Sequence, residues 1–271
     1  MLKKQTNMNN TKSNKFFSFN SLFSSNELAF TLAEVLIALA IIGVIAAMTI
    51  PILIKTQQEK ATITALKKAY STLSSAYNLA VQENGTPDNW DIIALNSSAG
   101  SKNILDKLSP YLKTLTDCQS SSGCFYSGNY QKLMGGTWGS IEGSLTTSLG
   151  LNKIILSDGT SIYIQARSSD CTEGAGTNTS LALQNICALI GVDINGAQKP
   201  NRWGYDLFSF ELTKYGIIPR GSTADTASSF AANCDSSSSI GWGCAAWVIY
   251  NENMEYIKCN GLSWAGQHQC N

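Results

Sequence analysis

The sequence predicts an α+β fold in which a long N-terminal helix packs against a small antiparallel sheet with disulfide-stapled loops. Three observations support this prediction. Twenty uncharged residues, 35–54, precede a stretch with helical periodicity that ends near residue 84. Short β-prone runs separated by turn residues follow that stretch. All eight cysteines lie in this last region, at Cys118, Cys124, Cys171, Cys187, Cys234, Cys244, Cys259 and Cys270.

The uncharged run is long enough to cross a bilayer. At about 1.5 Å per residue, twenty helical residues span about 30 Å, which is the thickness of the hydrocarbon core. One acid, Glu34, directly precedes the run. Because a lone carboxylate near hydrocarbon is costly, Glu34 is a candidate functional residue. The structural alternative is that its side chain only extends to the lipid headgroups.

Residues 1–29 differ in composition from the run that follows. They are rich in Asn, Ser and Lys, and they contain four lysines and one acid, Glu27. Such a segment buries too little apolar surface to fold alone, and its positive charge favours a cytoplasmic N-terminus. The rest of the chain is then expected outside the inner membrane. An ordinary signal peptide cut near Ala47, or an uncleaved anchor, is the alternative.

Pro51 lies inside the run and is expected to bend the helix or melt it locally, because proline removes a helical hydrogen bond. A loop at the membrane exit is the alternative. Against the loop, apolar residues recur afterwards at spacings of three and four: Leu66, Tyr70, Leu73, Tyr77 and Ala80. This amphipathic half needs a partner to cover its apolar stripe, and Gly85-Thr86-Pro87 is predicted to end it.

The remaining residues, 85–271, suffice for one domain with its own core. Asp158-Gly159 separates two β-prone runs and predicts a hairpin over 153–164. Further strands are predicted over 187–194 and 205–212. Together they indicate a sheet of about four strands that packs on the amphipathic half of the helix.

Three other segments of this domain have weaker patterns. Residues 103–115 have helical spacing and are predicted as a short helix, interrupted by Pro110. Residues 221–239 are rich in Ser and Ala and are predicted to form an exposed loop. Residues 247–257 fit either a strand or a helix.

The even number of cysteines, all expected outside the inner membrane, indicates disulfides. None forms a Cys-x-x-Cys pair, so a zinc site or a thioredoxin-like redox site is poorly supported. Eight cysteines allow 105 pairings. Nearest-in-sequence pairing predicts the bridges 118–124, 171–187, 234–244 and 259–270. Several could instead remain free as small buried apolar side chains.

One loop of the predicted sheet has metal-binding character. Asp193, Asn195 and Asp206 supply oxygen atoms around a glycine turn, a pattern that resembles calcium loops. No bidentate Glu stands at the expected end, and Lys199 and Arg202 add positive charge. The alternative is a strand-turn-strand connection in which Asp193 and Asn195 hydrogen-bond their own backbone. No cofactor other than this possible calcium ion is predicted.

Several functional classes gain no support from the sequence. Four of the 19 basic residues and one of the 19 acidic residues lie in 1–29, which leaves a net charge of −3 beyond it. The basic residues are scattered, so no nucleic-acid surface is indicated. His268 is the only histidine, and no phosphate-binding glycine loop or His-rich cluster is present. An enzyme is therefore not predicted.

The N-terminal residues resemble the type IV pilins and the type II secretion pseudopilins. That family has a small residue, then Phe, Thr, Leu, any residue and Glu, followed by an apolar helix. Residues 30–34 match this pattern, whereas Ala29 replaces the usual glycine. The resemblance implies cleavage between Ala29 and Phe30, methylation of the new Phe30 amine, and pairing of Glu34 with the terminal amine of a neighbouring subunit. Pro51 also matches a position where pilin helices carry proline.

The resemblance also implies an organisation and a set of partners. The segments would be a cytoplasmic leader, a transmembrane and filament-core half of the helix, an amphipathic half, and an extracytoplasmic head: 1–29, 30–54, 55–84 and 85–271. The chain would be a structural subunit of a pilus or pseudopilus, made in the inner membrane with a single pass. Its partners would be a prepilin peptidase, an inner-membrane assembly platform, an indirectly acting assembly ATPase and homologous subunits.

Two other functions follow from different features of the chain. Five tryptophans of the head could bind a carbohydrate or a host surface, as in an adhesin-like minor subunit: Trp138, Trp203, Trp242, Trp247 and Trp264. The alternative is that most of them are core residues, because aromatic side chains dominate cores. An anchored periplasmic enzyme is the third possibility, and it predicts an uncut N-terminus and no filament.

Overall fold

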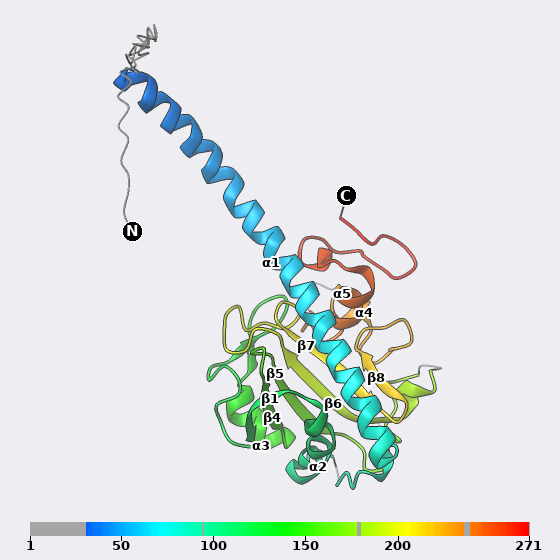
Figure 1. The fold of residues 1–271 in the computed structure, drawn as a ribbon. Helices are drawn as coiled ribbons and strands as arrows, with labels where there is room; N and C mark the ends of the chain where they lie inside the picture. Colours follow the sequence, from blue (N-terminus) through cyan, green and yellow to red (C-terminus); the bar gives the residue numbers. More distant parts are fainter. Residues whose placement is uncertain (1–30, 94, 178–179, 236–238, 271) are drawn as a thin grey trace, which may run out of the picture. The chain divides into compact units, whose positions relative to one another are not determined.

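The computed structural model describes residues 31–93, 95–177, 180–235 and 239–270. The predicted leader, with Ala29 and Phe30, lies outside these residues. The chain divides into two compact units, residues 1–51 and 52–271, which are described separately. Figure 1 shows the elements along the chain.

The described part of the first unit belongs to one helix. Helix α1, Leu32–Asn84, begins here and contains Pro51 within it. Because the helix is continuous through the proline, the loop alternative is wrong, and of the two effects predicted for Pro51 local melting is absent while the bend stays a prediction. The large apolar side chains of 32–50 are all exposed within this unit. No described residue of this unit packs over them, as expected for a segment that is surrounded by lipid or by neighbouring helices.

The second unit contains the rest of α1 and a six-stranded antiparallel sheet in the order β1-β4-β5-β6-β7-β8. The strands are β1 (Thr114–Gln119), β4 (Asn152–Leu156), β5 (Ser161–Ala166), β6 (Ile186–Asp193), β7 (Leu207–Thr213) and β8 (Gly216–Pro219). The four predicted strands are β4 to β7, so the prediction of about four omits the two edges. A separate pair consists of β2 (Tyr130–Gln131) and β3 (Thr137–Gly139).

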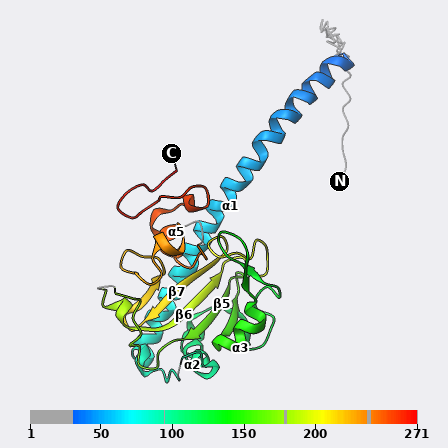
Figure 2. The same ribbon diagram turned by 180° about the vertical axis from the view of Figure 1, so that it is seen from behind.

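Residues 52–84 of α1 cover one face of this sheet, as the apolar stripe predicts (Figures 1 and 2). Leu66, Leu73 and Ala80 are fully buried. The Tyr70 ring stacks on Phe210 of β7 with centroids 5.8 Å apart. Helix α2, Ser98–Leu108, contributes to the same core, and α1 ends directly before the predicted stop at Gly85.

The opposite face of the sheet is also covered, which the sequence did not predict. Tyr163 of β5 belongs to a second core formed with Phe125, Tyr130 and Trp203, whereas Ile162 and Ile164 face the first core. Every residue of β5 is buried for this reason. Gly191, the cross-strand partner of Tyr163, leaves the space that the tyrosine ring fills: a Cβ there would lie 2.0 Å from it.

The helical segments differ from the weaker predictions. The helix predicted over 103–115 ends at Leu108, and β1 begins at Thr114. The ambiguous segment 247–257 contains no strand: its first part belongs to a helix that ends at Asn251, and its last three residues form a 3-10 turn. The predicted exposed loop 221–239 contains buried Phe230, which stacks on Trp247 at 4.0 Å. The other α-helices are α3 (Thr146–Leu149), α4 (Phe230–Asn233) and α5 (Ala245–Asn251). A π-helix spans Ile141–Leu145, and 3-10 turns span Pro87–Asn89, Ser109–Tyr111, Ala182–Gln184 and Glu255–Ile257.

Four disulfides hold the loops of the second unit. They join Cys118 to Cys124, Cys171 to Cys187, Cys234 to Cys244 and Cys259 to Cys270. These are the pairs that nearest-in-sequence pairing predicts. Each closes a loop of 6 to 16 residues, so each fixes local loop geometry more than it restricts the whole chain.

Candidate functional site

Glu34 and Thr31 form a reciprocal cap at the start of α1. Both the main-chain N–H and the hydroxyl of Thr31 donate to Glu34 Oε2, at 2.8 and 2.9 Å. The main-chain N–H of Glu34 donates to Thr31 Oγ1 at 3.2 Å. This capping box satisfies two N–H groups that a helix start leaves free. It holds the carboxylate of Glu34 at the first turn, against Thr31, the residue that follows Phe30 in the sequence. Thr-x-x-Glu is the sequence signature of such a cap, but this contact was not predicted.

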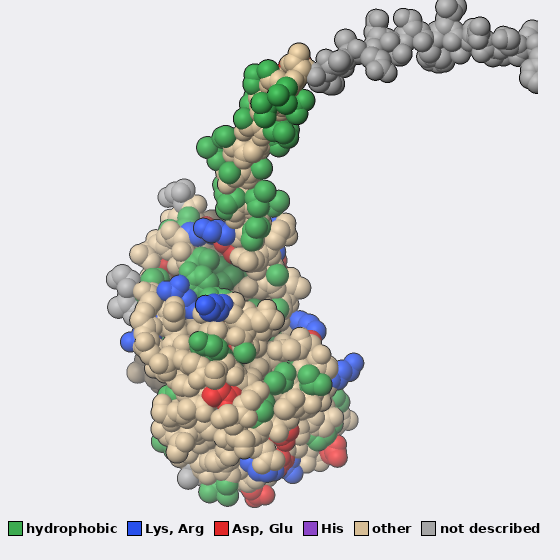
Figure 3. Space-filling model, turned by 90° about the vertical axis from the view of Figure 1, so that its left-hand side faces the viewer, with side chains coloured by type: hydrophobic (Ala, Val, Ile, Leu, Met, Phe, Trp, Pro, Cys, Tyr) green, Lys and Arg blue, Asp and Glu red, His purple; other side chains and the backbone are tan. Residues whose placement is uncertain are grey.

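Helix α1, whose first turn contains Glu34, is long and apolar enough to cross a membrane. A window of 18 residues in α1 has a mean hydropathy of 2.8, and no part of that window is buried in the protein. Figure 3 shows hydrophobic side chains gathered along this segment. The carboxylate therefore lies at the end of an exposed hydrophobic surface, where an opposite charge would offset the cost of removing it from water.

The three candidate calcium ligands do come together at the end of β6. Asp193 and Asp206 are almost completely buried. The Tyr130 hydroxyl donates to Asp193 Oδ2 at 2.6 Å, and the Asn195 N–H donates to Asp193 Oδ1 at 3.2 Å. The N–H groups of Asn201 and Arg202 donate to the two oxygens of Asp206, each at 2.6 Å.

Burial raises the pKa of both of these acids. It raises the pKa of Asp206 to about 6. It also raises the pKa of Asp193 well above its usual range, and the charge of Asp206 adds to that effect. Two acids this close repel each other when both are ionised, which is why the charge of Asp206 raises the pKa of Asp193 further.

The hydrogen bonds of this arrangement include those that the strand-turn-strand alternative predicts. All four carboxylate oxygens already accept a hydrogen bond, including the bond from Asn195 to Asp193 that the alternative predicts. Two amide oxygens nearby, Asn195 Oδ1 and Asn201 Oδ1, are buried without a partner. However, no group of three or more His, Cys, Asp or Glu side chains suited to a metal occurs among the described residues.

We expect calcium to leave the melting temperature of the protein unchanged and to produce no binding heat. The reason is that every carboxylate oxygen already accepts one hydrogen bond, which leaves each oxygen at most one lone pair for an ion, and Lys199 and Arg202 add positive charge nearby. Differential scanning calorimetry with millimolar calcium, compared with magnesium and with EDTA, tests this. A calcium-specific rise that EDTA reverses would contradict it.

The tryptophans proposed as a binding surface are largely core residues. Trp203 and Trp247 are fully buried. Trp138, Trp242 and Trp264 are half-buried and pack edge-on or tilted against them. All five side chains are thus at least partly buried, as the core alternative predicts.

His268, which a hydrolase triad would need, lies in an exposed C-terminal segment. Its imidazole Nε2 is 3.2 Å from the main-chain oxygen of Trp264, and its ring packs against Trp247. These contacts place the histidine against the aromatic cluster and give it a packing role.

Comparison with known proteins supplies a further finding about the N-terminal segment. Residues 24–50 match the family described as the prokaryotic N-terminal methylation motif, which is the cleavage signal of type IV pilins and pseudopilins. A search of curated proteins and a search of solved structures found no match. The matched residues contain Glu34 and most of the apolar run.

Proposed function

We propose that this chain, which carries the N-terminal signal of type IV pilins and pseudopilins, is a structural subunit of a pilus or pseudopilus. It is cut between Ala29 and Phe30 by a prepilin peptidase, methylated at Phe30, and polymerised through α1. The observation that carries the proposal is the acid at the first turn of an exposed apolar helix, within the matched motif. The motif itself points to a structural subunit of this type.

Glu34 has a defined role in this proposal. Its carboxylate is held by Thr31, the residue after Phe30. Cleavage creates an ammonium group on Phe30, and the same group is present on every neighbouring subunit. An ammonium within a few ångströms of a carboxylate favours the ionised form and offsets its desolvation. A neighbour whose terminus lies at the level of Glu34 is therefore favoured over neighbours in other registers.

The exposed side chains of α1 supply the second argument. Leu36, Ile37, Leu39, Ile41 and Ile42 are each more than half exposed, and so are most of the large apolar residues that follow. In the bilayer, lipid covers this surface. Outside the bilayer, only other apolar helices can do so without a large cost. Homologous subunits that bundle their helices provide that cover, with the 52–271 units outside the bundle.

The partners and the location follow from the same steps. A single apolar segment holds the new subunit in the inner membrane, with residues 1–29 on the cytoplasmic side and 52–271 outside. The prepilin peptidase acts first, and an inner-membrane assembly platform then moves the subunit into the filament. An anchored binding module is the alternative function, and it requires neither cleavage nor a helix bundle.

The N-terminal mass of the membrane-extracted protein tests the proposal directly. Cells with and without prepilin peptidase are compared, and a chain that begins at N-methylated Phe30 is expected only when the peptidase is present. The variant Glu34→Gln is expected to be cut but to be lost from sheared filaments, because it lacks the charge that pairs with a neighbouring amine.

Two other results would overturn the proposal. A chain that begins at Met1 in both strains would favour the anchored binding module. A chain that begins after Ala47 would indicate an ordinary secreted protein, and the proposed role of Glu34 would be wrong.

A further inference from the structure

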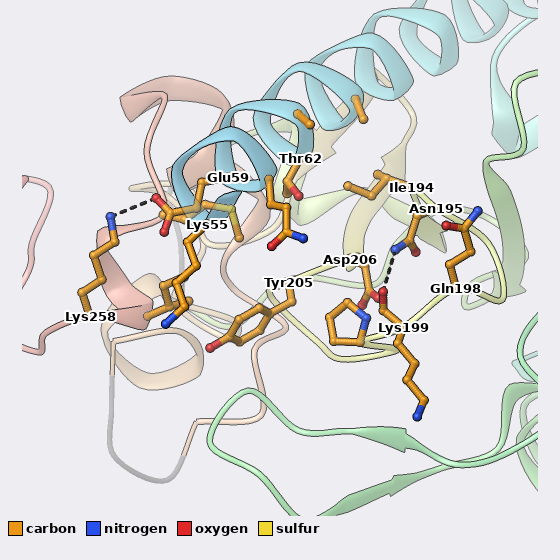
Figure 4. A pocket seen from close by; sticks show the side chains of 16 residues that line it. Lys55, Glu59, Thr62, Ile194, Asn195, Gln198, Lys199, Tyr205, Asp206 and Lys258 are labelled. Atoms are coloured by element: carbon orange, nitrogen blue, oxygen red, sulfur yellow. Dashed lines mark hydrogen bonds and ion pairs between the residues drawn. The ribbon is translucent and has the colours of Figure 1, made fainter. Parts of the chain in front are cut away.

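A pocket of about 910 Å³ opens in the second unit between three separate segments. Helix α1 contributes Lys55 and Glu59, the connection between β6 and β7 contributes Asn195, Lys199 and Tyr205, and Lys258 comes from the C-terminal segment (Figure 4). This volume lies within the range of about 300–1,000 Å³ that is usual for sites of small ligands.

The side chains that line the pocket carry an excess of positive charge. Lys258 is neutralised by Glu59 at 2.9 Å and by Glu255 at 3.0 Å. Lys55 and Lys199 are exposed, and neither forms an ion pair within the part of the chain that the structure describes. The other acid of the pocket, Asp206, is buried and already accepts two main-chain N–H bonds. The two unpaired lysines favour an anionic ligand.

The sequence places this pocket at a membrane surface. Lys55 is the first charged residue after the uncharged run 35–54. When that run spans a bilayer, the charged residue at its end lies at the level of the lipid phosphates. A lysine at this level gains about 1 kcal/mol from an anionic lipid surface. A pocket that Lys55 lines is therefore within reach of lipid headgroups.

We propose that this pocket binds the headgroup of an anionic glycerophospholipid, with its phosphate attracted by Lys55 and Lys199. This proposal rests on the proposed function, because it requires residues 35–54 in the bilayer. The bound lipid keeps the subunit at the membrane surface until assembly removes it.

Lipid retention by the full-length protein tests the proposal. The protein is reconstituted in nanodiscs with equal amounts of phosphatidylglycerol and phosphatidylcholine, extracted in mild detergent, and examined by native mass spectrometry. Phosphatidylglycerol is expected to be retained preferentially. The variant Lys55→Gln/Lys199→Gln is expected to lose that preference by roughly twentyfold, at about fivefold for each lysine.

The matched control is Lys60→Gln/Lys113→Gln, which removes two exposed lysines that do not line the pocket. It is expected to retain phosphatidylglycerol like the unaltered protein. Equal losses in both double variants, or equal retention of the two lipids, would overturn the proposal. Displacement of the lipid by inorganic phosphate alone would assign the pocket to free phosphate instead.

The same samples separate this proposal from the proposed function. Resistance of the unaltered protein to carbonate extraction reports insertion of α1. Loss of the protein into the carbonate wash would refute the membrane-inserted subunit itself. Firm insertion without a preference for phosphatidylglycerol would refute the lipid site alone.

Discussion

Replacing Glu142 by alanine is expected to destabilise the 52–271 unit by about 3–5 kcal/mol, as is typical when one partner of a buried ion pair is removed. The Glu142 and Lys153 side chains are 4% and 0% exposed, and their charged atoms are 3.0 Å apart. Glu142 also accepts the main-chain N–H groups of Gly123, Cys124 and Phe125, which lie at the end of the loop that the Cys118–Cys124 disulfide closes and directly after it.

The two partners should not be equivalent. Without Glu142, a buried ammonium and three N–H groups lose their acceptor at once, and only the 2.9 Å bond from Lys153 Nζ to Thr146 Oγ1 remains. In Lys153→Met, the carboxylate keeps its three N–H donors. We therefore expect Glu142→Ala to cost more than Lys153→Met, with Glu142→Gln between them because its amide oxygen still accepts.

Urea unfolding of the full-length protein, followed by tryptophan fluorescence, measures these differences. All six tryptophans lie beyond residue 51, so their emission reports on the 52–271 unit. The control is Lys102→Met, which breaks an exposed i,i+4 pair with Asp106 and should change the midpoint little. A midpoint for Glu142→Ala that equals the control would show that the ion pair contributes nothing.

Local signals explain which parts of the fold the sequence could predict. The Asp158-Gly159 turn and its flanking runs are adjacent in the chain, and so are the paired cysteines, so pattern alone located them. Lys153 illustrates the limit. Its alternation with Ile154 predicts a solvent-facing lysine, but the loops between β1 and β4 cover that face. Whether the second face of the sheet is buried depends on segments that are far away in the sequence. The local alternation of apolar and polar residues therefore does not predict it.

The functional residues also divide into those that local sequence predicts and those whose contacts come from distant segments. Glu34 stands out because a charge interrupts apolar sequence, and its capping contact with Thr31 is also local. The meeting of Asp193 with Asp206 was expected, but the donors that fill both carboxylates were not, since Tyr130 comes from a distant strand. The lysine-lined pocket was missed because three segments build it, and each lysine by itself has the pattern of an ordinary surface residue.

The stability of the 52–271 unit is expected to fall as the pH rises from about 5 to 9, and Glu211 should cause a large part of this change. This β7 residue is 2% exposed, and burial raises its pKa from 4.5 to about 8. The negative charges of Asp225 and Glu173 add to the rise, while Arg220, 3.5 Å away, and Arg167 oppose it.

The direction in which stability changes with pH follows from proton binding to the folded and unfolded states. Between pH 4.5 and 8 the folded protein holds a proton on Glu211 that the unfolded chain releases, so each increase in pH favours unfolding. Below this window both states are protonated and the stabilisation is complete. At about 1.4 kcal/mol per pKa unit, the loss across the window is on the order of 5 kcal/mol. Asp206, with its pKa raised to about 6, adds a smaller loss that is complete by neutral pH, and the raised pKa of Asp193 adds a loss of the same sign.

The variant Glu211→Gln is expected to flatten this dependence above about pH 6, because an amide of the same shape cannot ionise. Melting temperatures at about pH 5, 7 and 9 measure the slope, and the exposed Glu83→Gln provides a control that should keep the slope of the unaltered protein. Parallel slopes for the unaltered protein and Glu211→Gln would contradict the prediction. They would mean that Glu211 is already ionised beside Arg220, and that an ion pair rather than a protonated acid joins β7 to the segment after β8.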